Sequence, residues 1–123
     1  MAPQMKLAAF LLPTGHHAAA WRHSGSAPDA GSNFKRQLEQ ARLAERGLFD
    51  AVFIADFTSS IDEATINGFR RMTYAASFEP LTLLSALAAT TDKIGLIGTV
   101  STTYSVPYHL ARQFLSLDQI SGG

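Results

Sequence analysis

The stretch Glu45–Asp56, ERGLFDAVFIAD, carries the main signals for the fold. Gly47 is a typical helix stop, and Phe49-Asp50 leaves room for only a very short turn. Ala51–Ala55 is a short apolar run bounded by acidic residues, which predicts a strand buried on both faces. The stretch therefore indicates a helix that turns sharply into a buried strand.

Two further apolar runs flank this strand in the sequence. Lys6–Leu12 ends at Pro13-Thr14-Gly15, and Ile94–Val100 follows Asp92-Lys93, which is another very short turn. Both runs predict strands buried on both faces. Amphipathic helical patterns alternate with the strands, so the chain contains three strand-helix pairs in a row. This order predicts an α/β fold with a parallel sheet and helical crossovers.

The three predicted helices have apolar stripes and recognisable ends. The stripes are Phe34, Leu38, Ala41, Ala44 and Leu48 in the first helix, Leu84, Leu87, Ala88 and Thr91 in the second, and Leu110, Phe114, Leu117 and Ile120 in the third. The expected ends are Ser32 or Asn33 and Gly47 for the first helix, Pro80 for the start of the second, and Pro107 and Gly122 for the third.

The connections between these elements differ in length. The turns from helix to strand are very short, whereas Pro13–Ser32 and Asp56–Glu79 follow strands and are long. Ligands of parallel α/β folds bind at the carboxyl ends of the strands. We therefore expect the site in the loops that follow the strands. The basic pair Arg70-Arg71 lies in the second long loop and is interpreted as a solvated turn.

Composition excludes several classes of function. The chain has 123 residues, ten basic and ten acidic, with no basic cluster of the kind that binds nucleic acid. No apolar run reaches the roughly 20 residues of a membrane helix. The absence of cysteine excludes disulfides and favours a cytoplasmic protein. His16 and His17 are adjacent, and no third ligand has a zinc-like spacing, so no metal site is predicted.

Thr99–Pro107, TVSTTYSVP, places hydroxyl groups at the end of the third predicted strand. Thr99 and Ser101 alternate with Val100, so their side chains share one face while the strand stays extended. They either meet a polar ligand or bond the backbone before the next helix, with Ser105 as part of its cap. Asp56 ends the second strand and leaves the same two alternatives open, a ligand contact or a local cap.

Three collinear segments resemble the flavin-dependent monooxygenases of the bacterial luciferase-like superfamily. They are Ala20–His23 (AWRH), Glu45–Asp56 (ERGLFDAVFIAD) and residues 79–123, EPLTLLSALAATTDKIGLIGTVSTTYSVPYHLARQFLSLDQISGG. The similarity is strongest to the group that contains nitrilotriacetate monooxygenase and dibenzothiophene sulfone monooxygenase. It implies a TIM-type (β/α)8 barrel that binds FMN. The resemblance further implies that a separate NAD(P)H-dependent flavin reductase supplies the reduced FMN and that dioxygen then serves to oxidise a small organic substrate.

The resemblance also implies roles for particular residues. Asp56 and Thr99 match flavin contacts of the family, and Ser101 is a weaker candidate because it lies close by. Trp21, Arg22 and His23 match a segment of the loop after the first strand. Arg22 could attract an anionic substrate group and Trp21 could form an apolar wall. The alternative is a loop pinned by one aromatic side chain, with its charged groups in water. No catalytic residue is assigned.

The resemblance covers only the beginning of such a barrel. Residues 1–123 would be the N-terminal portion of one barrel domain, with three of its eight strands, and full-length relatives are commonly homo-oligomers. We therefore expect a fragment or a truncated gene product that is marginally stable and inactive alone. Two alternatives stay open: a non-catalytic remnant, or a flavin-binding α/β module of flavodoxin-like order, which would need two further strands.

Overall fold

The computed structural model describes residues 4–17, 19–56 and 77–123. The elements in these ranges are β1 (Ala8–Phe10), the 3-10 turn η1 (Ala20–Arg22), α1 (Phe34–Arg46), β2 (Ala51–Ile54), α3 (Pro80–Ala88), β3 (Gly95–Gly98) and α4 (Pro107–Ser121). The strands form one parallel sheet in the order β1-β2-β3, as the sequence predicts. None of the described helices is long and apolar enough to cross a membrane.

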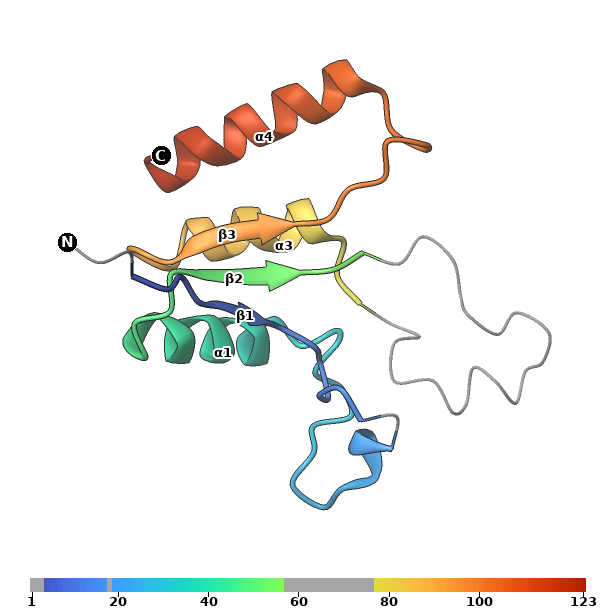
Figure 1. The fold of residues 1–123 in the computed structure, drawn as a ribbon. Coiled ribbons are helices and arrows are strands. Elements are labelled where there is room, and N and C mark those ends of the chain that lie inside the picture. Colours follow the sequence, from blue (N-terminus) through green and yellow to red (C-terminus); the bar gives the residue numbers. More distant parts are fainter. Residues whose placement is uncertain (1–3, 18, 57–76) are drawn as a thin grey trace.

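The strand register divides the sheet into two different faces. Ala9, Val52 and Leu96 lie side by side in the register and belong to the hydrophobic core. Their neighbours in the chain point to the opposite face, because side chains alternate along a strand. Figure 1 shows α1 and α4 on either side of the strands and α3 behind them. Within the described ranges no helix covers the opposite face, which we call the open face.

The α3 helix forms the centre of the core. It is apolar around much of its circumference, and Leu84 and Leu87 are fully buried together with Val52 of β2. The side chain of Glu79 caps the helix by accepting hydrogen bonds from the backbone N–H groups of Leu81 (3.0 Å) and Thr82 (2.7 Å). Burial of each leucine contributes about 2 kcal/mol, so α3 holds the sheet and helices together.

The prediction that all three strands are buried on both faces is wrong at the open face of the described structure, where even Phe53 of the central strand β2 is only half-buried. Ala51, Val52 and Ile54 of β2 are buried, but Phe10 in β1 is 38% exposed and Ile97 in β3 is 46% exposed. β1 and β3 are the edges of the described sheet, and their outward-facing residues lie on the open face. A continuous apolar run indicates a parallel strand, but it does not show how far each face of the strand is covered.

The first helix begins and ends as predicted, with one exception in its stripe. The Oδ1 atom of Asn33 accepts a hydrogen bond from the Arg36 N–H at 3.4 Å, and Gly47 is the C-cap. Leu48 lies beyond the helix and is 87% exposed, so it is not part of the buried stripe. Gln37 takes an unexpected buried position, where its Nε2 donates to the carbonyl oxygen of Ala30 at 3.0 Å.

The third predicted helix, α4, has the expected end, but its predicted apolar stripe is less buried than expected. Gly122 has a φ of 85°, which is the left-handed conformation expected after a helix. Leu117 is buried, but Phe114 is 39% exposed and Ile120 is 53% exposed. The idea that Ser105 helps to cap this helix is wrong, because the N-cap is Val106 and no side chain caps that end.

Leu48 is expected to be a site where glycine stabilises the protein. Its φ is 60°, a left-handed conformation that strains residues with a Cβ atom, and its exposed side chain contributes little burial. Leu48→Gly should raise the free energy of unfolding by about 0.5–1 kcal/mol, measured by urea denaturation. Leu48→Ala is the matched control, because it removes the side chain but keeps the strain. Equal stability of the two variants would contradict this explanation.

Candidate functional site

The loops that follow the strands lie at one end of the sheet, as the sequence predicts. Figure 1 shows the three strands pointing in the same direction, with the segments after β1 and β3 leaving from their carboxyl ends. The segment after β2 includes residues 57–76, and the predicted solvated turn at Arg70-Arg71 lies there, outside the described residues. The carboxyl ends are therefore the first place to examine for a ligand site.

Thr99 lies at this end of the sheet, and its side chain is exposed. Its backbone N–H donates to the carbonyl oxygen of Ile54 at 3.0 Å, so β3 stays paired with β2 up to this residue. Val100 packs against the core, whereas Thr99 is exposed. The alternation therefore directs the Thr99 hydroxyl to the open face. Ser101 lies three residues beyond the end of β3 and is half-buried.

Asp56 lies two residues beyond the end of β2 and is half-buried. Because Ile54 pairs with Gly98, Asp56 and Thr99 follow the ends of neighbouring strands at the same edge of the sheet. Neighbouring strands are about 4.8 Å apart. In the described part of the chain no hydrogen bond joins the two side chains. The structure thus brings the two backbone positions together at this edge of the sheet.

The open face contains a row of large apolar side chains that lies next to Thr99, toward the amino ends of the strands. Phe10, Phe53 and Ile97 occupy matching positions on the three strands. The rings of Phe10 and Phe53 have their centroids 4.8 Å apart, and the ring of His16 meets Phe10 edge-on at 5.2 Å. This surface is not predicted from the sequence. Its signal is visible only when the strands are aligned, because these three residues are distant in the chain.

Trp21, Arg22 and His23 form a separate group in and after η1. The Arg22 guanidinium carbon lies 4.8 Å from the centroid of the Trp21 ring, and the His23 Nδ1 accepts a hydrogen bond from the Gly25 N–H at 3.1 Å. Trp21 is half-buried, while Arg22 and His23 are exposed. In Figure 1 this light-blue segment lies beyond the end of β1, away from the loop after β3. The described structure does not bring these residues together with Asp56 and Thr99.

Among the described residues, one buried hydroxyl in the turn after β1 has no hydrogen-bond partner. Thr14 lies in the turn after β1, and its Oγ1 is the single buried, unpaired side-chain polar atom in the part of the chain that the structure describes. Sequence reasoning placed Thr14 only in a turn. A buried hydroxyl without a partner is unusual, because most such groups are hydrogen-bonded.

Two of the carboxylates with altered pKa values, Glu79 and Asp50, are occupied by structural contacts. Partial burial raises the pKa of Glu79, but hydrogen bonds from Thr82 and Leu81 outweigh this effect and hold the pKa below its usual value. The hydrogen bond from the Lys6 side chain, with a second from the Leu7 N–H, lowers the pKa of Asp50 at the other end of the sheet. Neither carboxylate is therefore a free acid or base for a ligand.

The sequence of the chain matches a known family over nearly its whole length. The profile of the luciferase-like monooxygenases matches residues 10–123. N-acetyl-S-(2-succino)cysteine monooxygenase of Bacillus subtilis (strain 168) is 51% identical over 120 residues, which are 98% of this chain and 26% of the relative. Nitrilotriacetate monooxygenase component A of Aminobacter aminovorans is 37% identical over 126 residues, 98% of this chain and 28% of the relative.

A solved structure supports the same relationship. A riboflavin lyase structure, described as containing modified FMN and riboflavin as substrate, superposes with a TM-score of 0.84 at 28% sequence identity. The match covers 98% of this chain and 28% of that one. This chain thus spans about a quarter of the length of the curated relatives that it matches. The family match over residues 10–123 confirms the expected resemblance: the chain belongs to the luciferase-like monooxygenases, a family of flavin-dependent enzymes.

Proposed function

We propose that this chain supplies flavin-binding strand ends to an FMN-dependent monooxygenase that oxidises a small organic substrate with dioxygen. The observation that carries the proposal is the position of Asp56 and Thr99. They follow the ends of neighbouring parallel strands, and Thr99 lies above an open apolar face. In this view residues 1–123 are the N-terminal portion of a TIM-type (β/α)8 barrel whose other strands lie elsewhere.

The chemistry of this surface fits the isoalloxazine ring of FMN. That ring is flat and aromatic and has hydrogen-bonding atoms along part of its edge. Phe10, Phe53 and Ile97 offer an apolar surface for such a ring, and the Thr99 hydroxyl can donate or accept a hydrogen bond at its edge. The Asp56 carboxylate can accept a hydrogen bond from a ring N–H, with the Ser101 hydroxyl as a further contact.

The bound FMN supplies the oxidation chemistry, in its reduced form and with dioxygen. The residues of this chain bind the ring, orient the substrate and keep water away from the reacting centre. Phe10 and Phe53 exclude water from the face they cover, and His16 lies against the edge of Phe10. Asp56 and Thr99 fix the position of the ring through polar contacts.

We propose that Trp21, Arg22 and His23 belong to the substrate-binding loop. Arg22 is exposed and carries a permanent positive charge, so it suits a carboxylate group of a substrate. Nitrilotriacetate is a tricarboxylate, and a succino group also carries carboxylates, so the names of the two curated relatives agree with such a substrate class. The Arg22 guanidinium lies over the ring of Trp21 in a cation–π contact.

The proposal includes a partner enzyme and an assembly. The designation "component A" of the nitrilotriacetate relative indicates a multicomponent system. We propose that a separate NAD(P)H-dependent flavin reductase supplies the reduced FMN and that the full-length enzyme is a homo-oligomer. Residues 1–123 alone are expected to be inactive, because most of the barrel that would enclose the flavin belongs to the remaining length of the relatives.

Replacing Thr99 tests the flavin site. In a hybrid barrel, this chain replaces the matched quarter of the Bacillus subtilis relative. Thr99→Val should weaken FMN binding about tenfold, because one hydrogen bond to the ring is lost while the shape is kept. The measurement is a fluorescence titration with FMN. Thr102→Val is the matched control, since Thr102 is also exposed but lies in the turn beyond the strand end. Equal FMN affinity of the two variants would argue against the assigned role of Thr99.

A further inference from the structure

The buried stripe of α1 contains one polar residue. Gln37 lies in line with Ala41 and Ala44, and these three are the buried residues of the helix. Gln37 is 4% exposed, although an apolar side chain would fill this position without giving up hydrogen bonds to water. A buried amide lowers stability unless its polar groups find partners. The position therefore favours glutamine only through the contacts of its amide.

The amide of Gln37 fixes the last part of the loop between η1 and α1. Its Nε2 donates to the carbonyl oxygen of Ala30 at 3.0 Å, and Ala30 is 1% exposed. In the part of the chain that the structure describes, no other group donates to this carbonyl oxygen. Loss of the Gln37 amide would leave the carbonyl buried without a donor, which is unfavourable. The bond therefore ties the loop to the helix.

Further hydrogen bonds connect Ala30 with Trp21. The Ala30 N–H donates to the carbonyl oxygen of Ala27 at 3.0 Å, which closes a turn next to Ser26. The Ser26 Oγ donates to the carbonyl oxygen of Trp21 at 3.1 Å. The Arg22 guanidinium in turn lies over the ring of Trp21. A continuous path of contacts thus runs from the buried face of α1 to an exposed cation.

We propose that Gln37 is a positioning residue for Trp21 and Arg22, which holds the guanidinium where a carboxylate substrate meets it. The inference rests on the proposed role of Arg22 in substrate binding. A charged group that is already held in place binds its substrate more tightly, because less conformational entropy is lost on binding. Gln37 acts on this loop and not on the flavin. Its loss should therefore raise KM and leave kcat nearly unchanged.

The fluorescence of Trp21 reports the state of the loop, because it is the single tryptophan of the chain. Gln37→Met keeps the length of the side chain and removes the donor. We expect acrylamide to quench this variant about twofold more strongly than the unmodified chain, because the loop opens more often. Gln113→Met, the same change at an exposed position of α4, should leave the quenching unchanged. Equal quenching of the two variants overturns the proposal.

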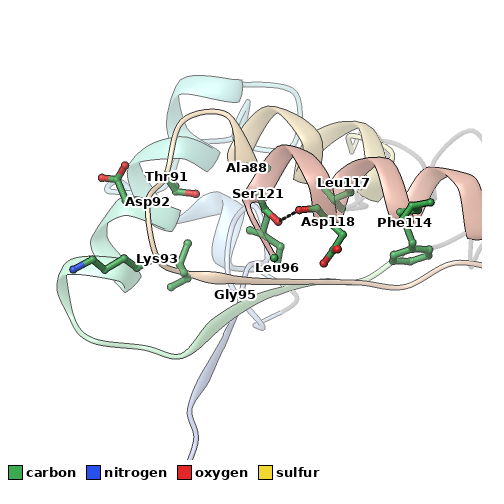
Figure 2. A pocket seen from close by; sticks show the side chains of 13 residues that line it. Ala88, Thr91, Asp92, Lys93, Gly95, Leu96, Phe114, Leu117, Asp118 and Ser121 are labelled. Atoms are coloured by element: carbon green, nitrogen blue, oxygen red, sulfur yellow. Dashed lines mark hydrogen bonds between the residues drawn. The ribbon is translucent and has the colours of Figure 1, made fainter.

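A second variant tests the other end of the path without changing α1. Ser26→Ala removes the hydrogen bond to the Trp21 carbonyl oxygen, so it should also increase the quenching. Ser121→Ala is the matched control, because the Ser121 Oγ donates to the carbonyl oxygen of Asp118 at 2.9 Å (Figure 2). Ser121 is the last residue of α4, away from η1. An effect of Ser26→Ala no larger than that of Ser121→Ala overturns the proposal. Circular dichroism shows whether each variant remains folded.

Kinetics of the hybrid barrel test the effect on the substrate. The substrate is N-acetyl-S-(2-succino)cysteine, which the name of the Bacillus subtilis relative gives, with reduced FMN and dioxygen in excess. We expect Gln37→Met to raise KM at least about fivefold, while kcat falls less than about twofold. If Arg22→Gln raises KM and Gln37→Met does not, the inference about Gln37 alone is wrong. If Arg22→Gln also leaves KM unchanged, the proposed role of Arg22 is wrong and this inference fails with it.

Discussion

Replacing Leu84 with alanine is expected to lower the free energy of unfolding by about 3–5 kcal/mol, which is a large fraction of the total for a small domain. Leu84 is fully buried in α3, at the centre of the core. The substitution removes buried methyl groups and leaves a cavity that the surrounding side chains fill only in part. Urea denaturation measures the loss. Leu43→Ala, at an exposed position on α1, should change stability by less than about 0.5 kcal/mol.

The close approach of Leu84 to Gly98 makes the prediction specific. A Cβ atom at Gly98 would lie 2.7 Å from the Leu84 Cδ1 and 3.6 Å from the Pro80 Cβ, so Gly98→Ala should cost about 1–3 kcal/mol. In the double variant the new methyl group occupies space that Leu84 has left. The double variant should therefore lose less free energy of unfolding than the sum of the losses in the two single variants, by about 1 kcal/mol or more. Simple additivity would contradict the packing of α3 against β3.

Glu45→Gln is expected to lower the free energy of unfolding by about 1–3 kcal/mol at neutral pH. The Glu45 Oε1 accepts hydrogen bonds from the backbone N–H groups of Asp92 (2.9 Å), Lys93 (2.6 Å) and Ile94 (3.0 Å). One carboxylate at the end of α1 thus fixes the turn between α3 and β3. A neutral amide accepts these bonds more weakly. Glu39→Gln, at an exposed position of the same helix, is the matched control and should have little effect.

The pH dependence of the stability lost in Glu45→Gln identifies the cause of that loss. The hydrogen bond from Lys93 is the main reason that the pKa of Glu45 is lowered, the bonds from Asp92 and Ile94 add to it, and partial burial opposes them. A carboxyl whose pKa is lower in the folded state stabilises the protein above its unfolded pKa of about 4.3. The stability difference between the wild type and Glu45→Gln should be constant above that pH and shrink as the pH falls below it. A difference independent of pH would contradict the ionic contacts.

Local signals predicted the elements well because their causes are local. The end of α1 at Gly47, the start of α3 at Pro80 and the left-handed residue Gly122 after α4 follow from backbone chemistry within a few residues. Three alternating strand-helix units were enough to predict a parallel sheet. Leu48 was placed wrongly because its spacing fits the helical stripe, whereas the chain leaves the helix one residue earlier.

Which residues are buried, and which form the surface of the site, depends on contacts between residues that are distant in the chain. Continuous apolar runs do not distinguish the central strand β2 from the edges β1 and β3, and this difference exposes Phe10 and Ile97. The exposure of Thr99 beside the core-packed Val100 agrees with the alternation expected along the strand, because that rule needs only the strand itself. The pairing of Phe10 with Phe53 and the contact with His16 required the register across strands and the fold of the turn after β1.

A crystal structure of the hybrid barrel with bound FMN tests the central claim most directly, because it shows which end of the sheet binds the flavin. We predict that the ring lies against Phe10 and Phe53 at the carboxyl ends of the strands, with the Thr99 Oγ1 within about 3.2 Å of a flavin nitrogen or oxygen. An FMN molecule that contacts neither Thr99 nor Asp56 would contradict the account.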